Sequence, residues 1–241
     1  MGNRGSEWNK WDFHVHTPYS VLRNGYGDPN NEETWKKYSK LLKEECDKQN
    51  IVGLGITDYY SIEGYEKLYN NRSKYGLEDI FIFPNIEFRT NDVIYTDSNS
   101  RQNVKKVNFH ILFSPEVPID EIKENFLENL IFYNVSTVFG DTYSKKLKKN
   151  NIIKFGKKLR ENGVTRNKSD LVIGYNNLLI NMDDILEELN NNSEFTGKYL
   201  CVMADENLSN IDWDSQAASL RVKLTKQPTN EIDAIGSPPF K

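Results

Sequence analysis

The chain has 241 residues, of which 27% are charged and 37% hydrophobic, and its formal net charge is −4. This length allows one large domain or two small ones, with enough residues to bury a core. No stretch approaches the roughly 18 apolar residues that span a bilayer, and the N-terminus lacks an apolar signal-peptide core, so we expect a cytoplasmic protein. The mild negative charge excludes a wholly basic nucleic-acid coat but not a local basic groove.

The first half of the chain alternates between strand and helix patterns. An alternating run at residues 11–16 predicts a strand, and a compact apolar run at 51–57 predicts a buried parallel strand. Between them, apolar residues at helical spacing predict a helix over 32–49. A second helix is expected from an N-cap at Ser61 to about Tyr75, followed by a strand at 80–86. This order predicts an α/β fold with a parallel sheet or barrel.

The second half shows a less regular pattern. Two β-prone runs are joined by a polar stretch, and the later segments alternate between helix and strand signals. The expected strands are 87–95, 104–113, 170–175, 199–204 and 232–235. The expected helices are 118–130, one or two within the basic residues 142–162, then 181–190 and 214–225.

Histidine is rare in this chain, and two of its three histidines form the pair His14-x-His16. Residues i and i+2 of a strand point to the same face, so both imidazoles can converge on one ion. Imidazole suits Zn, Fe, Mn and related metals. The pair by itself is a weak motif, and two ordinary histidines near a strand end are the alternative.

Further polar residues fall at the ends of the expected strands, where a βα barrel places its functional groups. Asp58 ends the second strand and Glu87 the third, while His110 lies in the long strand that follows. Three imidazoles and two carboxylates suffice for a site with one or two metal ions. Alternatively, Glu87 pairs with Arg89 or Lys105, and His110 is a core histidine.

Four segments resemble the motifs of the PHP (polymerase and histidinol phosphatase) superfamily. They are Asp12-Phe13-His14-Val15-His16-Thr17-Pro18-Tyr19-Ser20, Ile56-Thr57-Asp58 with Ser61-Ile62-Glu63-Gly64-Tyr65, Asn85-Ile86-Glu87, and His110-Ile111-Leu112. Arg4-Gly5-Ser6-Glu7-Trp8 before the first motif and Asp58-Tyr59-Tyr60 in the second are most similar to the N-terminal PHP domains of bacterial TrlF-type PHP–ATPase proteins. The resemblance implies a distorted (β/α)7 TIM-like barrel that hydrolyses a phosphoester with water activated on bound metal ions. It also implies an association with DNA repair or phage defence.

The resemblance covers residues 8–115 and is faint over 116–241, although we expect one PHP-like domain over 1–241. Tyr59 stands where the family usually has a histidine ligand, and no histidine follows His110. Asp205 or Glu206, after the strand at 199–204, is a candidate substitute for a later ligand of the family. The chain ends where the family would enter its last barrel strands. It is therefore either an N-terminal fragment or a shortened barrel that closes differently.

The expected cofactor is one or two divalent metal ions, with Mn, Fe or Zn favoured and Mg as a further candidate. Asp58 is expected either as a ligand or as a residue that orients a ligand or acts as general base. Arg23, Arg89 and Tyr59 are candidate phosphate contacts, with a solvated charge or simple packing as the alternative.

Two functions from different classes remain open. The first is a metal-dependent phosphodiesterase or nuclease acting on nucleic acid or nucleotide. The second is a degenerate PHP scaffold that binds nucleic acid or a partner without catalysis. The basic segment Lys145–Arg160 is a candidate nucleic-acid contact, although such runs are usually solvated helix faces. The resemblance to PHP–ATPase proteins implies an ATPase domain or subunit as a candidate partner, since this chain has no ATPase phosphate loop of its own.

Overall fold

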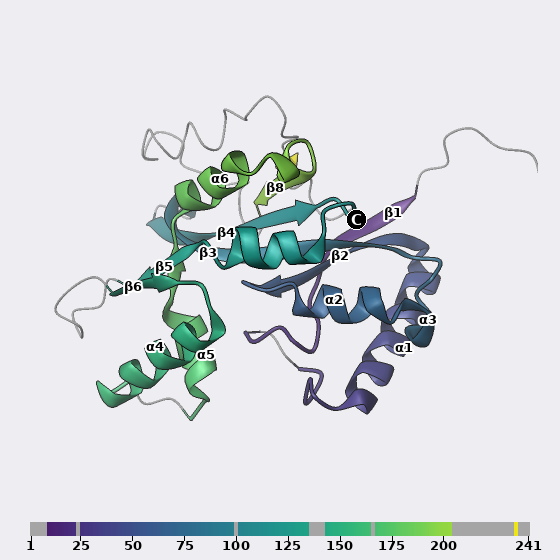
Figure 1. The fold of residues 1–241 in the computed structure, drawn as a ribbon, viewed down its shortest axis with the longest axis horizontal. Coiled ribbons are helices and arrows are strands. Elements are labelled where there is room, and N and C mark those ends of the chain that lie inside the picture. The colour runs from purple at the N-terminus through teal and green to yellow at the C-terminus, as the bar shows by residue number, and fades with distance from the viewer. Residues whose placement is uncertain are drawn as a thin grey trace, which may run out of the picture. The chain divides into compact units, whose positions relative to one another are not determined.

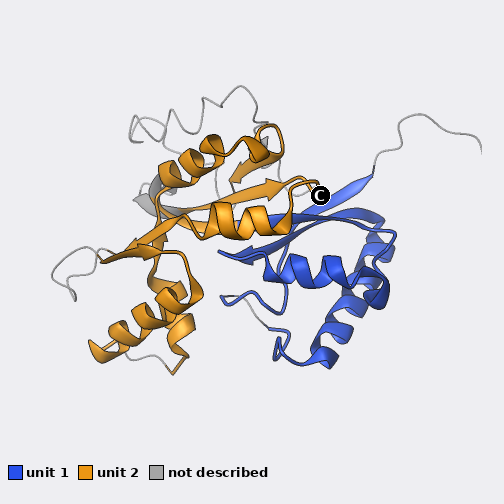
Figure 2. Ribbon diagram, viewed as in Figure 1, with its two compact units in different colours: residues 1–86 blue, residues 87–241 orange. Residues whose placement is uncertain are grey.

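The computed structural model describes residues 9–22, 25–98, 101–134, 143–164, 167–203 and 234–235 (Figure 1). For residues 92–98, 101–106 and 234–235 it describes the backbone alone. The chain divides into two compact units, Met1–Ile86 and Glu87–Lys241 (Figure 2). The single PHP-like domain over 1–241 stays a prediction. None of the helices in the described ranges is long and apolar enough to cross a membrane.

Unit 1 has the strand–helix order that the sequence predicts. Its elements are β1 (Lys10–Val15), α1 (Glu32–Gln49), β2 (Ile51–Tyr59), α2 (Glu63–Asn70), α3 (Arg72–Tyr75) and the start of β3 (Phe81–Ser98). β1 pairs with β2 in parallel, and β2 also pairs with β3. The predicted helix 32–49 is confirmed with its bounds, because Asn31 caps it and Asn50 ends it in the left-handed conformation.

The predicted N-cap at Ser61 is wrong by one residue. Ile62 is the N-cap of α2, while Ser61 Oγ accepts a hydrogen bond from the Glu63 N–H at 3.1 Å. Ser61 forms an isolated bridge with Asp58, which keeps its backbone at the end of β2. Tyr60 between them has a φ of 56°, a costly conformation for a non-glycine residue. The helical region ends near Tyr75, as predicted, with Gly76 as its C-cap, although the region is split into α2 and α3.

Glycine lets β1 lie unusually close to β2. A Cβ added at Gly55 would lie 2.5 Å from the Phe13 carbonyl oxygen, and one at Gly53 would lie 2.2 Å from the Trp11 ring. The Trp11 ring also contacts Phe13 and Phe81. These three rings stay 40–63% exposed, so β1 and β3 carry an open aromatic surface in unit 1.

Unit 2 combines short strands with helices. Its further elements are β4 (Arg101–Phe113), the π-helix η1 (Glu121–Leu127), β5 (Ile131–Asn134), β6 (Tyr143–Lys146), α4 (Lys149–Glu161), α5 (Asp170–Asn177), β7 (Leu179–Ile180), α6 (Met182–Asn191), the 3-10 helix η3 (Ser193–Phe195), β8 (Tyr199–Met203) and β9 (Ala234–Ile235). The strand order is β6-β5-β7-β3-β4-β8-β9.

The sheet of unit 2 is mixed. β4–β8, β5–β6 and β5–β7 are antiparallel pairs, whereas β3–β7 and β8–β9 are parallel. The α/β class is therefore confirmed, but the uniformly parallel arrangement of a regular βα barrel is not seen among these pairs. Closure into a (β/α)7 barrel stays a prediction.

Two sequence predictions in unit 2 are wrong. The basic residues 142–162 begin with the strand β6, which forms a hairpin with β5, before α4 starts. The predicted strand at 170–175 is the helix α5, because the Ser169 side chain caps its first turn. The predicted helix over 181–190 is confirmed as α6, capped by Asn181. The expected helix at 214–225 lies outside the described residues.

α4 and α5 pack closely through two glycines. A Cβ at Gly156 would lie 1.8 Å from the Asp170 carbonyl oxygen, and one at Gly174 would lie 2.4 Å from the Ile152 carbonyl oxygen. Backbone atoms cannot give way as a flexible side chain can. The contact therefore depends on the absence of a side chain at both positions.

Gly156→Ala should destabilise the protein by about 1–3 kcal/mol, because the added methyl group forces α4 away from α5. The usual gain from replacing a helical glycine, about 0.5–1 kcal/mol, would be outweighed. Urea denaturation followed by circular dichroism measures the difference. Asn150→Ala, at an exposed position of the same helix, is the control and should be neutral or slightly stabilising. A Gly156→Ala protein as stable as the wild type would contradict the close packing.

Candidate metal centre

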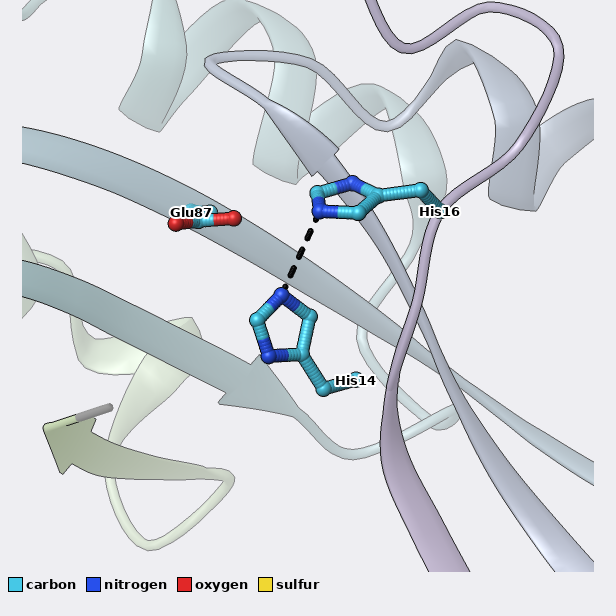
Figure 3. Close-up of side chains that lie close together, drawn as sticks. All are labelled: His14, His16 and Glu87. Carbon is cyan, nitrogen blue, oxygen red and sulfur yellow. Dashed lines mark hydrogen bonds between the residues drawn. The ribbon is translucent and has the colours of Figure 1, made fainter. Parts of the chain in front are cut away.

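Three predicted ligands converge at the end of β1. Ligand atoms of His14, His16 and Glu87 all lie within 4.8 Å of one another (Figure 3). His14 is the fifth residue of β1 and His16 follows its last residue, Val15. Glu87 directly continues β3 from Ile86, and is the first residue beyond unit 1. His14 is exposed, His16 is half-buried and Glu87 is fully buried.

The spacing of the two imidazoles fits a shared ion. His14 Nε2 and His16 Nε2 lie 3.3 Å apart. Two nitrogens bound at about 2.0–2.1 Å to one tetrahedral ion lie about 3.3 Å from each other. In the metal-free structure the same contact is a hydrogen bond between the two rings, drawn as a dashed line in Figure 3. The donor set, two imidazoles and one carboxylate, is one that binds catalytic Zn and Fe(II) with coordination positions left for water or substrate.

His16 is held on three sides by its neighbours. Ser20 Oγ lies 3.1 Å from its Nδ1, and the Tyr38 hydroxyl donates to its carbonyl oxygen at 3.0 Å. The Tyr59 ring stacks on the imidazole, with centroids 5.2 Å apart and planes 16° from parallel. Tyr59 is only 2% exposed, which favours packing over the predicted contact with substrate phosphate.

Asp58 holds the turn that follows His16. Its Oδ1 accepts from the Thr17 N–H at 3.1 Å, and the Thr17 hydroxyl lies 2.8 Å from its Oδ2. The Thr17 carbonyl in turn accepts from the Ser20 N–H at 2.9 Å. A Cβ at Gly64 would lie 2.1 Å from Asp58 Oδ2, so the start of α2 needs glycine there. These contacts favour the orienting role for Asp58 over the role of ligand.

Burial raises the pKa of Asp58 to about 7, because the charged carboxylate is disfavoured away from water. Hydrogen bonds from Thr17 and from the backbone of Gly64 act in the opposite direction and lower the pKa. Glu63 adds a smaller, raising contribution through like-charge repulsion.

Asn85 joins the three strands of unit 1 just before Glu87. Its Nδ2 donates to the Phe13 carbonyl oxygen at 2.6 Å and to Thr57 Oγ1 at 3.0 Å. Asn85 and Glu87 are two residues apart on β3, so strand alternation gives them the same face. Neither Asn85 nor Ser20 was predicted to have a function. Their only signal was their place within the motif segments.

The other predicted site residues lie elsewhere. His110 is buried on β4, paired in register with Val202 of β8, and is not a member of the converging group in the described residues. Arg89 is half-buried on β3, two residues after Glu87. Arg23, Asp205 and Glu206 lie outside the described residues. The ligand roles of His110 and of Asp205 or Glu206 and the phosphate contacts of Arg23 and Arg89 stay predictions.

The basic segment Lys145–Arg160 lies on β6 and α4, and part of its charge is already paired. Lys148 forms an ion pair with Glu128, and Arg160 Nε lies 2.7 Å from Asp170 Oδ1. Lys158 Nζ lies over the Tyr143 ring, 5.4 Å from its centroid. The remaining exposed lysines include Lys145 and Lys154. The positive surface is therefore smaller than the sequence suggests.

No family model matches the chain, and no curated protein matches it. One similar solved structure is that of a proposed metal-dependent phosphoesterase from Bifidobacterium adolescentis. The similarity covers 82% of this chain and 67% of that chain, at 12% sequence identity and a TM-score of 0.35. At this level of similarity, neither a shared fold nor a shared activity follows.

We expect the Asp58 carboxyl of metal-free protein to titrate near pH 7, whereas an unfolded chain would titrate at about 3.9. Between these values the folded protein keeps a proton that the unfolded chain releases. The contribution of Asp58 to stability therefore falls as the pH rises from about 4 to about 7, and is constant above that. Carbon-13 shifts of the carboxyl group and urea denaturation across this range measure both effects.

Thr17→Val tests the physical cause of this pKa. Loss of the hydroxyl donor should raise the pKa of Asp58 further, whereas Thr17→Ser, which keeps the donor, should leave it nearly unchanged. An Asp58 that titrates near its unfolded value in the wild type would contradict its burial.

Proposed function

We propose that the chain is a metal-dependent phosphoesterase whose metal centre contains His14, His16 and Glu87. The convergence of these three ligand atoms within 4.8 Å is the observation that carries the proposal. The buried Glu87 carboxylate adds to it, because a buried negative charge is stabilised by an adjacent cation. The motifs that resemble the PHP superfamily support hydrolysis of a phosphoester over other metal chemistry.

A divalent ion at this centre would lower the pKa of bound water and neutralise charge on the phosphoryl oxygens. The protein side chains have separate roles. His14, the most exposed ligand, faces solvent where substrate would arrive, while His16 and Glu87 are more enclosed. Asp58 holds the turn behind His16 through Thr17 and does not take part in bond breaking. Mn, Fe and Zn are the favoured ions for this donor set, with Mg as a further candidate.

We further propose a nucleic-acid or nucleotide phosphodiester as substrate, in a cytoplasmic protein that works with an ATPase domain or subunit. The basic residues of β6 and α4 support a phosphate-rich substrate, and the similarity to PHP domains of TrlF-type proteins supports the ATPase partner and the (β/α)7 barrel. The competing function is a degenerate scaffold that only binds nucleic acid. The small ligand group, which lacks His110 among the described residues, favours that alternative.

Glu87→Gln and the double variant His14→Ala with His16→Ala should each lose bound metal. Both should reduce hydrolysis of bis(p-nitrophenyl) phosphate by more than about 100-fold, because the ion loses ligands that hold it. Mass spectrometry of protein purified without chelator measures the metal, and absorbance measures hydrolysis. Glu116→Gln, an exposed carboxylate, is the matched control and should retain both. Wild-type protein without metal or hydrolysis would overturn the proposed function.

Lys145→Ala with Lys154→Ala should weaken binding of single-stranded DNA and lower the slope of log affinity against log salt by about 1–2. Each lysine that contacts a phosphate releases counterions on binding, so its loss removes that part of the slope. Fluorescence anisotropy at several salt concentrations measures the effect. Lys37→Ala with Lys40→Ala removes the same charge from α1 and is the control. Equal losses in both double variants would show that general charge, not this segment, attracts the DNA.

A further inference from the structure

His16 can serve as a ligand through Nε2 only in one neutral form. A neutral imidazole carries its proton on one ring nitrogen, and the other nitrogen keeps the lone pair that binds a metal. Nε2 is the ring nitrogen that lies 3.3 Å from His14 Nε2, so for Nε2 to bind the shared ion the proton has to be on Nδ1. The tautomer of His16 therefore depends on the group at Nδ1 as well as on His14 at Nε2.

Ser20 is the residue at that nitrogen. Its Oγ lies 3.1 Å from His16 Nδ1, and the side chain is fully buried. The hydroxyl has little freedom to move away, because the Ser20 N–H donates to the Thr17 carbonyl at 2.9 Å. Thr17 is itself bonded to Asp58 through both its N–H and its hydroxyl.

Tyr59 fixes the other degree of freedom of the imidazole. Stacking at 16° between planes restricts rotation of the His16 ring about its bond to Cβ. Tyr59 cannot easily move, because it is 2% exposed and its own ring contacts Tyr60. The ring plane and the nitrogen that bears the proton are thus set by two different residues.

We propose that Ser20 and Tyr59 are positioning residues that prepare His16 before the metal binds, an inference that rests on the proposed metal centre. Ser20 Oγ accepts a hydrogen bond from the Nδ1–H group of His16. The lone pair on Nε2 then stays free of a proton and points toward His14 and Glu87. Tyr59 holds the ring in the plane that this requires. In the opposite arrangement, the Ser20 hydroxyl donates to Nδ1 and Nε2 carries the proton, which would block coordination.

Histidine side-chain NMR of the metal-free full chain separates the two arrangements. Nitrogen-15 shifts report which ring nitrogen is protonated, and only three histidines need assignment, by one His→Gln variant each. We expect the Nδ1–H form for His16 in the wild type and in Ser20→Thr. Ser20→Ala should shift His16 toward the Nε2–H form and weaken Zn²⁺ binding by about 10–100-fold, as removal of such partners usually does.

Ser39→Ala is the matched control for the serine. Ser39 is also buried, but its hydroxyl donates to the Lys36 carbonyl within α1. It should change neither the His16 tautomer nor Zn²⁺ affinity. For the ring, Tyr59→Phe keeps the stack and should bind Zn²⁺ within about threefold of the wild type, whereas Tyr59→Leu should bind about tenfold more weakly.

The possible failures are distinguishable. A wild-type His16 in the Nε2–H form, or Ser20→Ala that binds Zn²⁺ as well as Ser39→Ala does, would overturn the role of Ser20 while the metal centre stands. Tyr59→Leu with unchanged affinity would overturn the role of Tyr59. A wild-type protein that binds no Zn²⁺, Mn²⁺ or Fe²⁺ overturns the proposed function and this inference together.

Discussion

The hydrogen bonds between Asp58 and Thr17 determine the arrangement of the site. Asp58 is the last residue but one of β2. Both of its carboxylate oxygens accept from the Thr17 hydroxyl, and Oδ1 also accepts from the Thr17 N–H. Thr17 follows His16 in the chain, so the carboxylate fixes the backbone directly after a ligand. The turn from Thr17 then brings Ser20 back to the imidazole. Burial of the carboxylate opposes its ionisation, and these donors partly offset that effect.

Small residues make this close arrangement possible. Gly64 allows the start of α2 to approach the Asp58 carboxylate, and Gly55 allows β1 and β2 to approach each other. Asn85 then links β1 and β2 to β3, one alternation step before Glu87. The ligands come from two strands whose spacing is set by glycine and amide contacts. A side chain at Gly55 would collide with the backbone of Phe13, and one at Gly64 would collide with the side chains of Asp58 and Thr17. We therefore expect the site to tolerate no larger residue at either glycine.

Local patterns predicted the parts of this structure that depend on nearby residues. The helix α1 and the pair His14 and His16 follow from spacing along the chain, and Glu87 from its place after an apolar run. Tertiary contacts decided the rest. The run Leu171-Val172-Ile173 has β-prone residues, but α5 forms there because Ser169 caps it and Gly174 permits close contact with α4. The function of Ser20 requires knowing that a turn returns it to His16, and no pattern in the sequence encodes that return.

β1 pairs with β2, and most of its residues are exposed. We therefore expect β1 to open locally, at a lower free energy than the unfolding of the whole of unit 1. An ion shared by His14, His16 and Glu87 would cross-link the end of β1 to β3 and close a loop of about seventy residues. Ligand binding of this kind stabilises the folded state by mass action. It would act most strongly on the opening of β1, so amide hydrogen exchange in this strand would report metal occupancy independently of any catalytic activity.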